Sequence, residues 1–266
     1  MSAGARPLRA TVGPAGLAAA LIGIALVAWI VTIDRMRGMD AGPGTDLGAL
    51  GWYLGVWVTM TAAMMLPSAA PMVLVFARLA RSRTRHGGAA TAAFVAGYLV
   101  VWTVYGLVAY GVFRGLRALD LRLLRWDANG PLVAGAAVAA AGLYELSPLK
   151  RVCLRHCRSP LHFLMHAWRP GATAPLRLGI EHGGYCVGCC LGLMLILFAL
   201  GAMSVLWMAV IAAVIFVQKV LPLGAATRAG LGVVLVALGV WIAAAPASVP
   251  GLNEPDAGAA MSTMSR

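Results

Sequence analysis

Charged side chains are scarce in this sequence. Only 11% of the 266 residues are Asp, Glu, Lys or Arg, whereas 61% are hydrophobic. A soluble domain carries about a quarter charged residues and at most about half apolar ones. The balance therefore excludes an ordinary soluble domain and indicates a membrane protein.

Acidic residues are fewer than basic ones, 9 against 21, and the formal net charge is +12. In a soluble protein this excess would favour binding to nucleic acid. Here the basic residues lie in short segments between apolar runs, and aromatic and basic residues do not interleave. We therefore expect no nucleic acid partner, and interpret the charge as a signature of topology and of an anionic bilayer surface.

The lengths of the uncharged runs give the expected number of membrane spans, because a membrane-spanning helix needs about 20 mostly apolar residues. Five runs have the length of one span, and a sixth is long enough for two helices with a turn at 201–204. A single tilted span with a partly buried tail is the alternative for that run. We expect an all-α, polytopic transmembrane helix bundle of about seven spans. The runs are 10–33, 47–77, 87–113, 128–144, 183–218 and 229–253.

The basic residues predict the topology. With a cytoplasmic N-terminus, 14 of the 21 Lys and Arg residues fall on the inner side, as the positive-inside rule requires. The first run follows Arg6 and Arg9 without a small-residue cleavage site, which favours a retained signal anchor. Residues 113–130 carry four Arg on the outer side and alternate Leu with Arg, so we interpret them as a short interfacial helix.

The chain shows no linker that would divide it. We expect a single polytopic membrane domain over residues 1–250, with its Cys/His-rich loop and helix start at 148–190. The small, polar segment 251–266 is expected to be a disordered tail.

One segment of 38 residues contains every cysteine, and the other 228 residues of the chain contain none. All five cysteines and four of the five histidines lie between Cys153 and Cys190. Residues three or four apart share one face of a helix, so two cysteine pairs can each present two donors to one point, as tetrahedral thiolate coordination requires. The histidines can extend or replace this set, whereas Cys190 is assigned to packing. The candidate ligands are Cys153, Cys157, Cys186, Cys189, His156, His162, His166 and His182.

Local signals suggest how these residues are held. Ser159 and Pro160 form an N-cap and first-turn pair, which predicts a short helix carrying His162 and His166. Gly183-Gly184 is expected to break the lead-in to the next span, leaving Cys186 and Cys189 in its first turn, where a helix N-terminus favours the thiolate. We expect the loop to turn at 169–171 and fold back, so that the two cysteine pairs meet.

Soft sulfur donors favour Cu(I), with zinc as the main competitor. The second apolar run adds Met60 and Met64, which lie one helical turn apart, followed by Pro67 and Pro71. If they face the cysteines, their thioethers extend the site into a route for Cu(I). The alternative is that these methionines only fill the core.

Two acidic residues lie near the ends of spans. Glu145 is expected to have a structural role and Glu181 to support the site, each next to basic residues that can pair with it. Lys150, Arg151 and Arg177 are the candidate partners.

Residues 135–222 resemble a bacterial family of predicted metal-binding integral membrane proteins of unknown function. The resemblance rests on Pro148-Leu149-Lys150, on the Cys153/Cys157 pair, on Trp168-Arg169 and on the block from His182 to Cys190. Gln218 stands before Lys219 where that family commonly has an acidic residue. The resemblance implies metal binding and assigns no activity. We expect a multi-pass protein of the bacterial inner membrane with a cytoplasmic N-terminus.

The sequence thus predicts a multi-pass membrane protein that handles a soft metal ion, Cu(I) or zinc, for transport, storage or delivery, with a metal-donating or metal-accepting protein as partner. We interpret it as a binding protein rather than an enzyme. The alternative is a membrane thiol–disulfide oxidoreductase that passes electrons between the cysteine pairs and a quinone. Such enzymes work on the oxidising side of a membrane, whereas the charge pattern puts these cysteines on the reducing side. Haem ligation by His162 or His166 lacks opposed histidines in mid-span.

Overall fold

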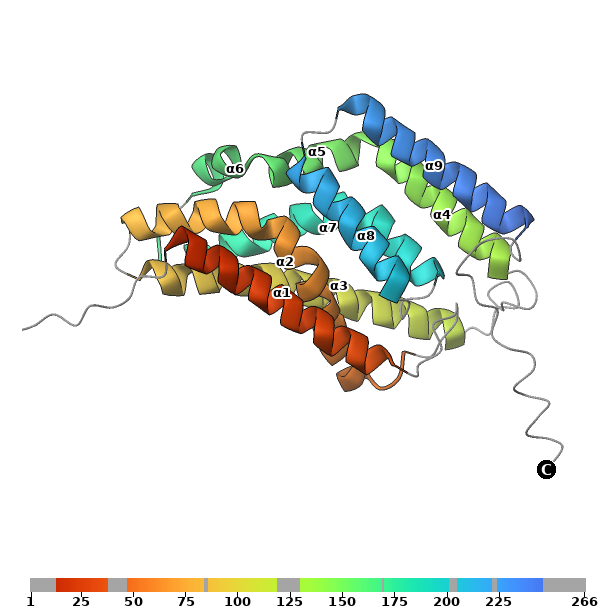
Figure 1. The fold of residues 1–266 in the computed structure, drawn as a ribbon, viewed down its shortest axis with the longest axis horizontal. Helices are drawn as coiled ribbons and strands as arrows, with labels where there is room; N and C mark the ends of the chain where they lie inside the picture. The colour runs from red at the N-terminus through yellow and green to blue at the C-terminus, as the bar shows by residue number, and fades with distance from the viewer. Residues whose placement is uncertain are drawn as a thin grey trace, which may run out of the picture.

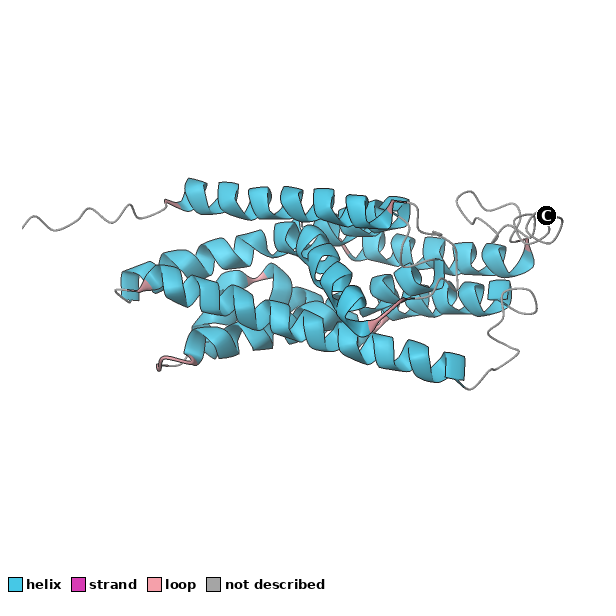
Figure 2. Cartoon of the chain, turned by 90° about the horizontal axis from the view of Figure 1, so that it is seen from below, coloured by secondary structure: helices cyan, strands magenta, loops and turns pink. Residues whose placement is uncertain are grey.

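The computed structural model describes residues 13–37, 47–83, 86–118, 130–168, 170–200, 205–221 and 224–245. Throughout this part of the chain the regular structure is α-helical (Figures 1 and 2), which confirms the expected fold class. The helices are α1 (Pro14–Met36), α2 (Leu50–Arg83), α3 (Gly87–Ala118), α4 (Gly130–Leu146), α5 (Pro148–Arg158), α6 (Pro160–Ala167), α7 (Ala174–Leu200), α8 (Val205–Val220) and α9 (Ala225–Ala244).

Each of the seven expected spans has a helix, but they differ in length. Helices α1, α2, α3, α7 and α9 are long and apolar enough to cross a membrane. Helix α8 has 16 residues, fewer than the roughly 20 that a span needs. Helix α4 has 17 residues and reaches a spanning length only together with α5, from which it is bent by 65°.

The run 183–218 forms two helices, α7 and α8, as expected, and the predicted turn at 201–204 lies outside the described residues. The expected start of the first helix is wrong. Helix α7 begins at Ala174 and continues through Gly183 and Gly184, so the cysteines lie in its middle. A Cβ at Gly183 would lie 2.9 Å from the Cβ of Val101, so this glycine serves close packing against α3.

The segment expected to be a Cys/His-rich loop is largely helical. It contains α5, α6 and the beginning of α7. Both short helices begin at a Ser-Pro pair, and the Ser147 hydroxyl accepts a hydrogen bond of 3.2 Å from the Lys150 backbone N–H. The predicted helix with His162 and His166 is confirmed as α6. In Figure 1, α6 lies at the same end of the bundle as the N-terminal ends of α1, α3 and α7.

Two other expectations concern segments that lie partly or wholly outside the described residues. Residues 113–118 of the predicted interfacial helix form the last part of α3, and 119–129 are not described. The predicted disordered tail, 251–266, also lies beyond the described part of the chain.

Glycines let the helix backbones approach closely. A Cβ at Gly179 of α7 would lie 2.0 Å from the carbonyl oxygen of Phe94 in α3, and one at Gly97 would lie 2.2 Å from that of Leu176. Helices α4 and α9 lie side by side (Figure 1) with glycine facing glycine: Gly135 against Gly239 and Gly142 against Gly232. Small residues that allow such contact are usual where helices pack in a bilayer, because hydrophobic burial does not drive helices together among apolar lipid tails.

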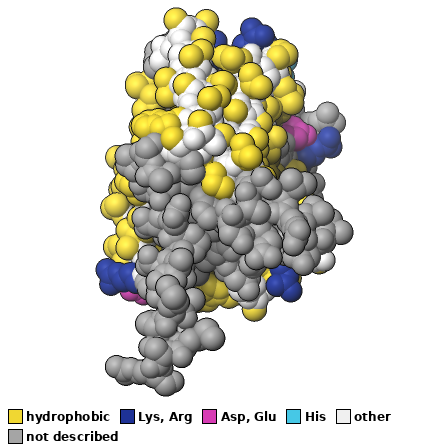
Figure 3. Space-filling model, turned by 90° about the vertical axis from the view of Figure 1, so that its right-hand side faces the viewer, with side chains coloured by type: hydrophobic (Ala, Val, Ile, Leu, Met, Phe, Trp, Pro, Cys, Tyr) yellow, Lys and Arg dark blue, Asp and Glu magenta, His cyan; other side chains and the backbone are white. Residues whose placement is uncertain are grey.

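The outer faces of the described helices are apolar. Ile30 of α1, Leu143 of α4 and Val233 of α9 each expose more than half of their surface. On the face drawn in Figure 3, hydrophobic side chains cover most of the described surface and Lys and Arg lie at its margins. Extended apolar faces of this kind are unusual on soluble monomers, and they suit a lipid environment.

The α3–α7 contact predicts unequal effects of two alanine substitutions in α7. Gly179→Ala drives a methyl group into the Phe94 carbonyl and should destabilise the protein by about 1–3 kcal/mol. Gly184→Ala meets no atom within 4 Å and should be neutral or stabilising, because alanine is the better helix former. Thermal unfolding of the two purified variants in detergent checks this. Equal loss in both would contradict the contact.

Candidate metal centre

One face of α7 carries most of the candidate metal ligands. Its buried residues recur every three or four positions, and α3, α4, α5 and α8 all pack against this helix. The face combines one histidine and three cysteines with an apolar continuation toward the end of the helix. These residues are His182, Cys186, Cys189, Cys190, Leu193, Met194 and Leu197.

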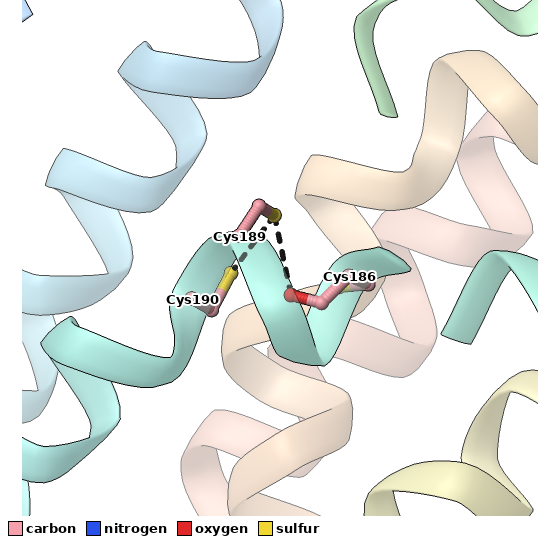
Figure 4. A group of neighbouring side chains, drawn as sticks. All are labelled: Cys186, Cys189 and Cys190. Atoms are coloured by element: carbon pink, nitrogen blue, oxygen red, sulfur yellow. Dashed lines mark hydrogen bonds between the residues drawn. The ribbon is translucent and has the colours of Figure 1, made fainter. Parts of the chain in front are cut away.

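The sulfurs of Cys186, Cys189 and Cys190 all lie within 4.8 Å of one another. Those of Cys189 and Cys190 are 3.5 Å apart, and the Cys189 thiol donates to the Cys186 carbonyl at 3.2 Å (Figure 4). The exposed fractions of the three residues are 0%, 1% and 1%. We call these three residues the sulfur cluster; it is a compact, dry group of soft donors.

A buried ammonium group faces the sulfur cluster. Lys219 of α8 lies 2.8 Å from the Cys186 sulfur and 3.4 Å from the hydroxyl of Ser68 in α2. The hydroxyl of Tyr98 in α3 lies 3.0 Å from the same sulfur. A buried charge needs a compensating partner, and these described partners include no carboxylate. The ammonium therefore places positive charge against a sulfur that carries negative charge when it binds a metal.

Helix α5 brings a fourth sulfur to the edge of the cluster. Cys157, which is half-buried, has its sulfur 3.7 Å from that of Cys189. Cys153, one turn earlier, packs instead against the backbone of α7, since a Cβ at Gly188 would lie 2.7 Å from its sulfur. The predicted return of α5 onto α7 is thus present in the fold. All five cysteines are free thiols.

A closed polar network fixes the N-terminal end of α5. Lys150 forms a fully buried ion pair with Glu145 of α4 and donates to the Gln218 side-chain oxygen of α8 at 2.9 Å. The Gln218 amide donates back to Glu145 at 2.9 Å. Every member therefore has a partner, as burial in an apolar bundle requires. This agrees with the structural role expected for Glu145.

The other end of α5 is tied to α8. Arg158 donates to the backbone carbonyls of Gln218 at 2.6 Å and Leu221 at 2.9 Å. Gln218 lies in the last turn of α8 and Leu221 directly follows this helix, where backbone carbonyls lack helical partners. In addition, the Tyr144 hydroxyl of α4 donates to the Gly188 carbonyl at 2.5 Å, next to Cys189.

The predicted histidine ligands lie outside the sulfur cluster. His182 is buried one turn before Cys186, with its ring among Phe94, Tyr98 and Phe163, and its Nδ1 atom has no hydrogen-bond partner in the described structure.

The other three histidines lie nearer the surface on α5 and α6. His156 stacks on Tyr185 at 4.2 Å between ring centroids. His162 and His166 stack on each other at 4.2 Å and are exposed. The structure therefore does not bring these three histidines into one group with the cluster sulfurs.

The two predicted methionines belong to the core that contains the cysteines. Met60 and Met64 of α2 are buried in one hydrophobic cluster together with Met194, Met208 and the three cluster sulfurs. Glu181 lies at the surface side of α7 and pairs with Arg177 at 3.0 Å, as the sequence suggested.

The donor set suits a soft metal ion. Thiolates select Cu(I) or zinc over hard cations. A metal–thiolate bond of about 2.3 Å, the value for zinc, puts the sulfurs of a trigonal site about 4 Å apart, which the cluster spacing accommodates. Structural zinc ordinarily takes four ligands, and the three cluster sulfurs together with Cys157 also number four, so the sulfur count alone suits either ion.

Residues 54–242 match the model of the PpoB2 family, which is described as copper chaperones. The chain belongs to this copper chaperone family. The match runs from the second turn of α2 to the last turn of α9 and includes every cysteine. Comparison with curated proteins and with solved structures gave no match.

Membership of the copper chaperone family and the sulfur cluster together support a metal-binding role, with copper as the favoured ion. The family is described by a role, that of a copper chaperone, whereas the resemblance noted in the sequence analysis assigns no activity. Zinc receives no such support and stays a prediction.

Sequence reasoning missed three members of this centre. The sequence analysis assigns Cys190 to packing, whereas the structure places its sulfur in one group with those of Cys186 and Cys189, because residues four apart share a helix face. Lys219 and Tyr98 were not considered as neighbours of the cysteines. A lone lysine near the end of an apolar run was the available signal for Lys219.

The buried network predicts a strong effect of Lys150→Met. The substitution leaves the Glu145 carboxylate buried without its cation, which typically costs about 3–5 kcal/mol. Arg177→Met breaks an exposed ion pair and should cost at most about 1 kcal/mol. Thermal unfolding in detergent measures both. Adding Glu145→Gln to the Lys150 variant should restore part of the loss, and failure to do so would contradict the assigned pairing.

Proposed function

We propose that this protein is a membrane-embedded copper chaperone that binds Cu(I) at the sulfur cluster and delivers it to a copper-accepting protein. The observation that carries the proposal is the burial of three thiols within 4.8 Å of one another, in a chain of the copper chaperone family. Burial keeps water away from the ion, and soft donors retain the reduced state. The proposal leaves Cys153 outside the ligand set, because its sulfur packs against Gly188.

The proposed location is the bacterial inner membrane. Five long apolar helices and their apolar outer faces support insertion. The positive-inside rule supports a cytoplasmic N-terminus, and α5 and α6, with the basic residues around them, would then meet the cytoplasm. The copper donor or acceptor would approach the protein from that side.

The proposal predicts one Cu(I) ion per chain in the purified protein. Cys186→Ser, Cys189→Ser and Cys190→Ser should each lower the affinity at least about tenfold, or about 1.4 kcal/mol. Cys153→Ser is the matched control and should bind as the wild type does. Competition with a chromogenic Cu(I) chelator measures the affinities. A wild-type protein that takes up no copper and contains disulfides would overturn the proposal in favour of thiol–disulfide exchange.

A second prediction concerns the thioethers of α2. We propose that Met60 and Met64 offer transient soft contacts to copper beside the sulfur cluster. Replacing both by Leu keeps volume and apolarity at a cost usually below about 1.5 kcal/mol. Copper delivery in cells should fall while expression and thermal stability hold. Unchanged delivery would return the two residues to core packing.

A further inference from the structure

The sulfur cluster has no direct access to water. Its three residues expose at most 1% of their surface and belong to the buried hydrophobic core, with the buried Lys219 ammonium beside Cys186. A copper ion that loads from a donor in water therefore needs an intermediate ligand. That ligand must reach water on one side and a cluster sulfur on the other.

Cys157 meets both conditions. It is half-buried on α5, and its sulfur is 3.7 Å from that of Cys189. The same helix presents Arg151 and Arg155 at the surface. Helix α5 therefore has one strongly polar face, and Cys157 lies between that face and α7.

The neighbouring cysteine does not meet them. Cys153 is 8% exposed and its sulfur contacts the backbone at Gly188. The anchors at both ends of α5, Lys150 and Arg158, hold this arrangement in place. The two cysteines of α5 thus differ in their environment, although they share the same helix and chemistry.

We infer that Cys157 is the exchange ligand through which Cu(I) enters and leaves the sulfur cluster; the inference rests on the proposed function. A donor thiolate complex meets Cys157, a copper–sulfur bond to Cys157 forms, and the bond to the donor breaks. The proton of the Cys157 thiol passes to the departing donor thiolate. The copper–Cys189 bond then forms as the bond to Cys157 breaks, and the Cys189 proton passes to Cys157. Cys186, a thiolate paired with the Lys219 ammonium, and the neutral Cys190 thiol complete the coordination with no further proton transfer. Copper stays Cu(I) throughout and no electron is transferred.

An exchange ligand and a permanent ligand predict opposite changes when the thiol is removed. Losing a permanent ligand weakens the site, so copper leaves faster. Losing an exchange ligand raises the barrier in both directions, so copper enters and leaves more slowly while the equilibrium is kept. The direction of the rate change therefore decides between the two roles.

The experiment uses the full chain in detergent and Cu(I) supplied as its bathocuproine disulfonate complex. Loading and chelator-driven release are followed by stopped-flow absorbance, and copper per chain at saturation is measured separately. Cys157→Ser should slow both rates at least about tenfold and still bind one ion. Cys153→Ser, the matched control, should keep the wild-type rates. Cys157→Met, which supplies a thioether, should recover most of the rate, which a purely structural role would not allow.

Faster release from Cys157→Ser, or rates equal to those of the wild type, would overturn the inference while leaving copper binding intact. Absence of copper binding in the wild type would instead overturn the proposed function, and the inference with it. Cys157→Ala guards against a folding defect: it should match Cys157→Ser in rate and the wild type in thermal stability.

Discussion

The buried ion pair between Lys150 and Glu145 determines where α5 lies, and the position of α5 brings the Cys157 sulfur to the sulfur cluster. An ammonium and a carboxylate inside an apolar bundle have to stay together, because separating them leaves an unpaired buried charge. Gln218 closes the network from α8, and Arg158 ties the far end of α5 to the same helix. The bent connection after α4 therefore becomes a fixed cover over α7, with Cys157 in contact with Cys189.

The same region shows how ionised sulfur can be accommodated in an apolar environment. Thiolates are costly to bury without compensation, and Lys219 supplies a positive charge 2.8 Å from the Cys186 sulfur. Tyr98 approaches that sulfur from a third helix. The centre thus combines soft ligands from α7 with charge from α8 and cover from α5.

Much of the helix pattern could be predicted from the sequence, because hydropathy and length act locally. The hairpin of α7 and α8 and the short helix α6 were found in this way. The start of α7 could not be predicted in this way, because a glycine pair predicts a helix break when the residues that pack against it are unknown. In the folded protein Gly183 packs against Val101, and this contact with α3 lies 82 positions away in the chain. Nothing within 4 Å of the Gly184 Cβ position accounts for the second glycine.

In the candidate site, too, the sequence predicts what depends on local helix geometry and does not predict what depends on packing between helices. The helical spacing within α7 contains the information needed to group Cys186, Cys189 and Cys190, because residues three and four apart share one face of a helix wherever that helix begins. The approach of Lys219, Tyr98 and Cys157 depends on how four helices pack, which no local pattern encodes. The predicted histidines show the reverse case, because His162 and His166 form the expected helix and yet lie exposed, away from the sulfurs.

The sulfur cluster belongs to five consecutive residues of one helix. Its spacing is therefore a property of secondary structure, with very low contact order, and it exists as soon as α7 forms. Burial and the neighbouring charge arrive later, when α3, α5 and α8 assemble around it. The thiols therefore come together in α7 before the other helices bury them. An α7 helix that is not yet packed exposes these thiols to any metal or oxidant around it.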